Sequence, residues 1–204
     1  MKIAVVGAAG MVGSRVVTEA LRRGHDVTAV FRGEIPVVPA GVRAVRGDAA
    51  DRELMDGLLS GVDGVVAATR PRPGDEDAVG PATRTLLDAA LATRTRILVV
   101  GGAAPLRSPG GGLVLDDSRY VPTHIRPVAA ASVRQFEVCR SHPAEWVYLS
   151  PPALLEPGER TGTYRRGRDV LLTGPSSISA EDLAVAVLDE LAEPGVDQHF
   201  TVAS

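Results

Sequence analysis

Short apolar runs alternate with amphipathic segments along much of the chain. Six of these runs predict strands, at residues 2–6, 26–32, 42–46, 64–68, 97–101 and 146–150. Segment 11–23 places Val12, Val16 and Ala20 on one face, which predicts a helix packed on a sheet, and further helices are expected at 51–59, 79–93 and 128–141. Strands that alternate with helices indicate βαβ units, so we expect an α/β fold of the Rossmann type, with a doubly wound parallel sheet.

Two stretches rich in glycine and proline interrupt this regularity, at residues 102–127 and 151–174. Each follows an expected strand at the sheet edge where doubly wound folds bind ligands, and long loops in a compact domain are usually functional or mobile. We therefore expect residues 1–204 to form one domain in which both loops border an active-site cleft. The second loop would belong to a small, irregular C-terminal region on the substrate side.

Composition narrows the class of protein. The chain of 204 residues is 45% hydrophobic and 23% charged, which fits a globular domain and neither a disordered nor a membrane protein. A net charge of −3 with scattered basic residues offers no surface for nucleic acid. Cys139 is the only cysteine, so we expect a buried, inert thiol, no disulfide and no metal site. The N-terminal residues read as a strand rather than a signal peptide, so we expect a cytoplasmic location.

The first expected strand runs directly into a glycine-rich turn and the first helix. Gly7, Gly10 and Gly13 have the spacing of dinucleotide-binding turns: the first permits the turn, the second admits the pyrophosphate, and the third lets the helix approach the strand. The start of the helix offers free N–H groups to the diphosphate. The residues expected to bind there are Gly7, Ala9, Gly10, Met11, Val12 and Gly13. The alternative is a strand-to-helix turn that binds no ligand.

The end of the second expected strand indicates which dinucleotide is bound. A domain that prefers NAD(H) carries a carboxylate there for the ribose hydroxyls, whereas this chain has Arg32, a donor suited to a 2′-phosphate. NADP(H) is therefore favoured over NAD(H), with Glu34 as the opposing feature. Asp48 and Ala49, after the third strand, are expected beside the adenine. The alternative for Asp48 is a simple turn residue.

The order of these motifs resembles that of the atypical short-chain dehydrogenase/reductases. The likeness is to their NAD(P)H-binding group, which includes NmrA-like proteins and flavin or biliverdin-IXβ reductases. It starts from the glycine turn, Arg32 and Gly47-Asp48, and continues through segments 99–103, 146–152, 158–164 and 178–184. The resemblance implies a cofactor lying across the carboxyl edge of the sheet. The positions it implies for the nicotinamide side are Ala68, Thr69, Gly101, Gly102, Ser150, Pro151 and Pro152.

The proton donors usual in this superfamily are missing. Its active members carry a Tyr-x-x-x-Lys pair, and the nearest match here is Tyr120 with His124, where Pro122 forbids a regular helix interior. A loop or packing role is favoured for both residues. Small residues at 102–103 replace a serine often found after the fifth strand, and Ala153 stands where biliverdin-type reductases commonly carry a histidine. No catalytic residue is assigned.

Two later segments carry polar residues with competing interpretations. Ser179, followed by Glu181 and Asp182, predicts an N-cap with acidic first-turn residues for a helix that ends near residue 193, in preference to a catalytic role. Tyr164, followed closely by three arginines, lies on the loop expected to border the nicotinamide. A solvated basic turn is favoured there over an aromatic ring against the substrate.

These features leave two hypotheses on function. The favoured one is an oxidoreductase, an NADPH-dependent reductase that transfers hydride to a flavin, quinone or similar conjugated acceptor, because such a transfer needs alignment more than a protein acid. The alternative is an NmrA-like sensor that binds NADP(H) without turnover. The first expects a small-molecule acceptor and the second a protein partner. Neither expects nucleic acid or a membrane.

Overall fold

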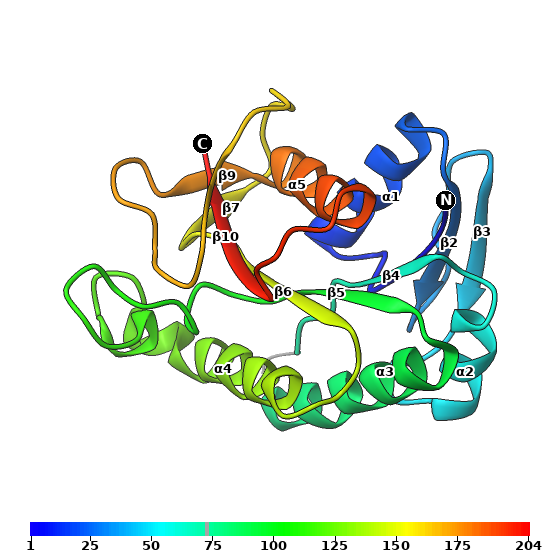
Figure 1. Cartoon of the computed structure of the whole chain (residues 1–204), viewed down its shortest axis with the longest axis horizontal. Coiled ribbons are helices and arrows are strands. Elements are labelled where there is room, and N and C mark those ends of the chain that lie inside the picture. The colour runs from blue at the N-terminus through cyan, green and yellow to red at the C-terminus, as the bar shows by residue number, and fades with distance from the viewer. Residues whose placement is uncertain (72–73) are drawn as a thin grey trace.

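An eight-stranded sheet forms the centre of the computed structural model, which describes residues 1–71 and 74–204 (Figure 1). Its strands are β1 (Lys2–Val6), β2 (Asp26–Phe31), β3 (Val42–Arg46), β4 (Gly64–Ala67), β5 (Arg96–Val100), β6 (Trp146–Ser150), β8 (Arg165–Gly167) and β10 (His199–Ala203). The helices are α1 (Met11–Arg22), α2 (Arg52–Leu59), α3 (Val79–Thr93), α4 (Arg126–Arg140) and α5 (Ala180–Ala192). Short 3-10 helices lie at η1 (Glu76–Ala78), η2 (Val114–Asp116) and η3 (Thr123–Ile125), and two short strands, β7 (Leu154–Glu156) and β9 (Ser177–Ser179), pair with each other.

The strand order reverses direction at β1, which marks one position along the edge of the sheet. Strands follow one another as β3-β2-β1-β4-β5-β6-β10-β8, and each neighbouring pair is parallel except β10 with β8. The chain proceeds outward from β1 to β2 and β3 and then returns to β4, on the other side of β1. This reversal separates the connections at the carboxyl ends of β1 and β4, which is where doubly wound folds bind their ligands. The expected α/β, doubly wound fold is confirmed.

Helices cover both faces of the sheet. The pair α1 and α5 lies on one face, and α2, α3 and α4 lie on the other (Figure 1). Neighbouring residues of β1 alternate between these layers, so that Val5 packs in the core beneath α1 and α5 while Val6 packs beneath α2 and α3. Because both faces are buried, the central strands are continuous apolar runs without polar alternation.

The predicted elements agree with the structure to within two residues, and the C-terminal quarter is more regular than expected. The expected helix caps are also confirmed: Asp51 accepts a hydrogen bond from the amide of Leu54, and Ser179 accepts one from the amide of Asp182. Strand β10 was not predicted. It lies beside β6 and extends the sheet, so the end of the chain is part of the core.

Residues 158–164, which we call the strap, lie against α1 and α5. Arg160 donates two hydrogen bonds, of 2.8 and 3.0 Å, to the carboxylate of Glu19 on α1. Tyr164 donates one of 2.7 Å to Asp189 on α5. Two further carboxylates in the first turn of α5 accept hydrogen bonds from strap amides. The strap is therefore anchored along its length to the helix layer.

The basic residues after Tyr164 are exposed, as expected, but Arg165 and Arg166 lie on strand β8 and not on a turn. Arg166 pairs with the fully buried carboxylate of Glu190 at 2.7 Å, and its guanidinium lies 3.9 Å from the centre of the Phe200 ring. Arg165 donates to the backbone carbonyl of Ser204 at the chain's end. These side chains are ordered because β8 brings them against β10 and α5, a pairing that the local sequence did not reveal.

The segment 102–127 also has packing of its own. Leu106, Val114 and Val121 form a small buried cluster with Leu171, beyond the end of the main core. Two of the 3-10 helices belong to this segment. It is therefore a folded excursion that leads from β5 to α4.

Candidate functional site

The turn after β1 packs so closely that two of its glycines are required by the fold itself. Gly7 has φ of +88°, and a Cβ there would lie 2.5 Å from the carbonyl oxygen of Ala68. A Cβ on Gly13 would lie 2.2 Å from the carbonyl oxygen of Gly7. Both distances are far shorter than any real contact, so α1 sits directly on the turn and the turn sits directly on the end of β4.

Gly10 is less tightly packed than Gly7 and Gly13. Its φ of −73° and ψ of 165° suit any residue, and the atom nearest to a Cβ at this position would be the Gly7 carbonyl oxygen, at 3.3 Å. Gly10 is solvent-exposed, as is Ala9 before it. The space above Gly10 is therefore open to a ligand, and a side chain there would intrude into it.

Helix α1 begins without a cap. Gly10 is its N-cap residue and has no side chain to accept a hydrogen bond, and the first turn holds no acidic residue. Within the described residues, the amides of Met11, Val12 and Gly13 have no protein acceptor. Unsatisfied first-turn amides with a partial positive charge make a binding site for an anion such as a phosphate.

Thr69, two residues after the end of β4, carries a buried polar atom without a partner in the described part of the chain. Its side-chain Oγ1 is inaccessible to solvent and has no hydrogen-bond partner among the described residues. Its backbone nitrogen would lie only 3.2 Å from a Cβ on Gly7, so Thr69 adjoins the glycine turn. A buried hydroxyl left unsatisfied costs about 1–3 kcal/mol. A ligand or water that bonds to Thr69 would remove this cost.

The ends of β2 and β3 bring the other predicted residues to the same edge. The amide of Gly47 donates to the carbonyl of Phe31 at 2.9 Å, which holds Arg32 close to Asp48 along the edge. Arg32 is exposed, with no ion-pair partner among the described residues. Asp48 accepts a 2.9 Å hydrogen bond from the amide of Ala50, so it forms the turn that was the simpler expectation. Ala49 beside it is buried.

The end of β5 rests on a buried tyrosine that the sequence did not reveal. A Cβ on Gly101 would fall 1.8 Å from the Tyr148 hydroxyl oxygen, so glycine is needed there for packing. The Tyr148 hydroxyl donates to the backbone carbonyl of Ser132 at 2.9 Å. Burial raises the pKa of Tyr148 well above its ordinary value. Gly102 in turn lies against the Ser132 side chain of α4.

The positions predicted at the end of β6 do not present their side chains to solvent. Ser150, Pro151 and Pro152 are all buried, and Ser150 Oγ lies 2.9 Å from Nε2 of His199 on β10. Burial lowers the pKa of His199 to about 4, so its imidazole is neutral near pH 7. The exposed positions that follow are residues 153 and 154. Any contact made by residues 150–152 would use the backbone or the proline rings.

The structure before α4 shows that Tyr120 and His124 are not placed as a Tyr-Lys pair would be. Helix α4 begins at Arg126, so Tyr120 and His124 both precede it, and Pro122 between them is extended with ψ of 151°. Tyr120 packs against the small cluster of segment 102–127, and His124 is exposed in η3. The chain's one lysine, Lys2, begins β1 at the opposite edge of the sheet.

A family model described as NAD(P)H-binding matches residues 7–194, from the glycine turn almost to the end of α5. The chain belongs to this family. The match takes in the glycine turn, strands β2 to β6 and the strap.

Relatives of this NAD(P)H-binding protein share its whole length. The uncharacterized protein YwnB of Bacillus subtilis is 35% identical over 212 residues, which cover 100% of this chain and 99% of that protein. A solved structure from Burkholderia pseudomallei, provisionally described as an exported protein, is 36% identical with a TM-score of 0.88 and full coverage of both chains. A Streptococcus pneumoniae protein, provisionally assigned as an NADH-flavin reductase, is 29% identical with a TM-score of 0.90, covering 100% of this chain and 99% of that one.

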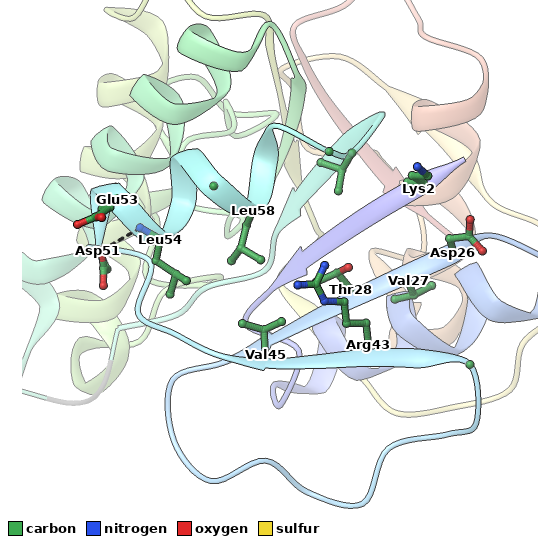
Figure 2. Close-up of a pocket in the computed structure, with 14 residues that line it drawn as sticks. Lys2, Asp26, Val27, Thr28, Arg43, Val45, Asp51, Glu53, Leu54 and Leu58 are labelled. Atoms are coloured by element: carbon green, nitrogen blue, oxygen red, sulfur yellow. Dashed lines mark hydrogen bonds between the residues drawn. The ribbon is translucent and has the colours of Figure 1, made fainter.

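A groove of about 770 Å³ lies away from the carboxyl edge, between α2 and strands β1–β3 (Figure 2). Thr28 and Arg43 project into it from the strands, Leu54 and Leu58 line it from α2, and Lys2 lies at one end. None of the residues expected to bind the cofactor lines this groove. The residues that the sequence indicated therefore gather on an open sheet edge and not in this hollow.

Metal ligands, membrane-spanning helices and the cysteine can also be assessed in the described part of the chain. Residues 1–71 and 74–204 contain no group of three or more His, Cys, Asp or Glu side chains that could hold a metal ion. Within the same residues, no helix has the length and apolar character needed to cross a membrane. Cys139 is buried, and burial raises its pKa to about 12, which keeps the thiol protonated near neutral pH.

Proposed function

We propose that the chain is an NADPH-dependent reductase of the atypical short-chain dehydrogenase/reductase type, which passes hydride to a flavin, quinone or similar conjugated acceptor without a Tyr-Lys pair. Membership of the NAD(P)H-binding family supports the cofactor class. The likeness to the Streptococcus pneumoniae protein supports the reaction class. We propose the cytoplasm as its location, because reduced nicotinamide cofactors are held there.

The described residues fit a nicotinamide dinucleotide. In this proposal the unpaired amides of Met11, Val12 and Gly13 hold the diphosphate in the open space over Gly10. Arg32 pairs with the 2′-phosphate and Asp48 with the adenine, beside Ala49. The backbone after β4 and the Thr69 hydroxyl meet the nicotinamide half, with Ala68 against the turn, and the ends of β5 and β6 complete that side at Gly101, Gly102, Ser150, Pro151 and Pro152.

One observation carries the choice of acceptor: among the described residues, the ends of β4, β5 and β6 offer no side chain suited to protonating a substrate. Tyr148 and His199 lie nearby, but Tyr148 is buried with its hydroxyl bonded to α4, and His199 is bonded to the buried Ser150. Bound NADPH would supply a hydride. The protein's part is to align the two partners and exclude water, and a conjugated ring can take its proton from solvent afterwards.

Cofactor binding and turnover test this proposal together. Titration with NADPH and NADH should show about 10- to 100-fold tighter binding of NADPH, and Arg32→Ala should reduce the difference. Arg84→Ala is a matched control, because Arg84 is exposed on α3 and has no ion pair among the described residues. Equal binding of both cofactors by the wild type would contradict the NADP(H) preference, and the NADH in the name of the Streptococcus pneumoniae relative makes this comparison necessary.

A second candidate is an NmrA-like sensor that binds NADP(H) and passes its state to a protein partner. The anchored strap favours it, because residues 158–164 are tied to α1 and α5 and do not form a free lid over the site. Oxidation of NADPH in the presence of free flavin or quinone separates the two. Turnover supports the reductase, whereas tight NADPH binding without turnover on any flavin, quinone or small carbonyl supports the sensor.

A further inference from the structure

Arg46, the last residue of β3, lies beside the end of β2. In the parallel ladder Arg46 is paired with Phe31, and the following amide, that of Gly47, donates to the Phe31 carbonyl at 2.9 Å. Arg32 is the next residue after Phe31. The backbone therefore fixes the two arginines as neighbours at the carboxyl edge.

The pleat of β3 directs Arg46 toward the face that carries α1. Val42 and Ala44 pack against the core beneath α1 and α5. Alternate residues of a strand point to the same face, so Arg46 shares the face of Val42 and Ala44. This is also the face of the helix whose first-turn amides are unpaired, so Arg46 belongs on the phosphate side of the edge.

Neither arginine side chain makes a polar contact within the described part of the folded chain. Arg46 and Arg32 are both exposed, and neither has a hydrogen-bonding or ion-pair partner among residues 1–71 and 74–204. Carboxylates are close in sequence to each, Glu34 beyond Arg32 and Asp48 beyond Arg46, yet no ion pair joins them. By contrast, the nearby Arg15 of α1 is paired with Glu181. The edge therefore presents two guanidinium groups with their donors free.

We propose that Arg46 acts with Arg32 as a two-arginine clamp for the 2′-phosphate of NADPH, which makes Arg46 a second specificity-determining residue. The inference rests on the proposed function. A phosphate monoester carries about −1.5 to −2 charges near neutral pH and three acceptor oxygens. One guanidinium bonds to at most two of those oxygens in its fork, so a second arginine has both a charge and an oxygen left to meet.

Arg46→Ala tests the clamp with NADPH, NADH and adenosine 2′,5′-bisphosphate as ligands. Loss of one charge-assisted contact at an exposed site should weaken NADPH and the bisphosphate by about tenfold and leave NADH unchanged within about twofold. Arg46→Lys keeps the charge without the fork and should fall between wild type and Arg46→Ala. The weakening should shrink as salt is raised.

The same strand supplies the control. Arg43 is also exposed, has no ion-pair partner among the described residues, and lies three residues earlier, or about 10 Å along the strand. Arg43→Ala should bind all three ligands as the wild type does. Thermal unfolding of each variant checks that the fold is retained.

The outcomes separate the clamp from the function on which it rests. Selective weakening of NADPH and the bisphosphate by Arg46→Ala supports the clamp. Equal weakening of NADPH and NADH, no weakening of either, or the same loss in Arg43→Ala overturns it while NAD(P)H binding stands. Wild-type protein that binds neither cofactor refutes the proposed function, and the clamp with it.

Discussion

Replacement of Glu19 by glutamine should reveal how strongly the strap is held. The buried Glu19 carboxylate accepts hydrogen bonds from Arg22, Arg23 and Arg160, the shortest of them 2.7 Å from Arg23 Nε. Breaking a buried ion pair costs about 3–5 kcal/mol. The arginine side chains are 55%, 21% and 34% exposed, so water can solvate them once the charge is lost. We therefore expect Glu19→Gln to lower the free energy of unfolding by about 2–3 kcal/mol, which for a domain of this size is about 4–12 °C in Tm.

The same carboxylate should make stability depend on pH. Burial raises the pKa of Glu19, but the hydrogen bonds from Arg160, Arg22 and Arg23 outweigh burial and hold the pKa well below the ordinary glutamate value. A carboxyl group whose pKa is lowered by folding stabilises the protein above the unfolded-state pKa of about 4.3 and loses that contribution as the pH falls toward the folded-state value. The difference between wild type and Glu19→Gln should therefore be full near neutral pH and should narrow below about pH 4.3.

Urea unfolding followed by circular dichroism measures both effects. Glu137→Gln on α4 is the control, because Glu137 is an exposed helical glutamate whose carboxylate has no partner among the described residues; its change should stay within about 0.5 kcal/mol. The m-values should match among the three proteins, so that midpoints report stability. A loss below about 0.5 kcal/mol in Glu19→Gln, or a gap to the wild type that does not narrow in acid, would show that the arginines do not depend on this charge.

Three further outcomes concern the glycine turn and the absent proton donor. Gly10→Val should abolish binding of both cofactors and leave the circular dichroism spectrum intact, and retained binding would mean that the turn is only structural. Gly13→Ala should lower the free energy of unfolding by about 1–3 kcal/mol or more, because its Cβ would meet the Gly7 carbonyl oxygen at 2.2 Å. Tyr120→Phe and His124→Ala should each change flavin reduction by less than about threefold, and a loss of about a hundredfold in either folded variant would identify a proton donor.

The elements that the sequence predicted are those specified by local pattern. Strand β4 is apolar throughout, and β1 and β5 are apolar after their first residue, because both faces of those strands are buried. The helices between them have one apolar stripe. Strand β10 lacked such a signal. It is five residues long, begins with His199 and Phe200, and follows a turn with proline and glycine. Its place depends on parallel pairing with β6, about 50 residues earlier in the sequence, which no local pattern encodes.

The residues of the candidate site also fall into those that local sequence predicts and those that depend on long-range packing. The positions of the glycine turn and of Arg32 were predictable because they depend on strands, a turn and a helix that are continuous in sequence. Tyr148 beneath Gly101, and His199 beside Ser150, were not, because each contact joins strands and helices that meet only in the folded sheet. The ion pair of Arg166 was not predictable for the same reason, because its partner Glu190 comes from α5.

The way each helix begins sets α1 apart from the other helices. Helices α2 and α5 start at Asp51 and Ser179, whose side chains accept first-turn hydrogen bonds. Helices α3 and α4 have no such cap, but each continues directly from a 3-10 turn, η1 or η3, whose carbonyls precede the first helical amides. In the described chain α1 alone has neither device, since Gly10 contributes no side chain and an extended residue leads into the helix. Because α1 begins without a cap where the strand order reverses, its first-turn amides are left for an anion to bind. The missing cap was visible in the sequence, since Gly10 stands where Ser, Thr, Asp or Asn would stabilise the helix more.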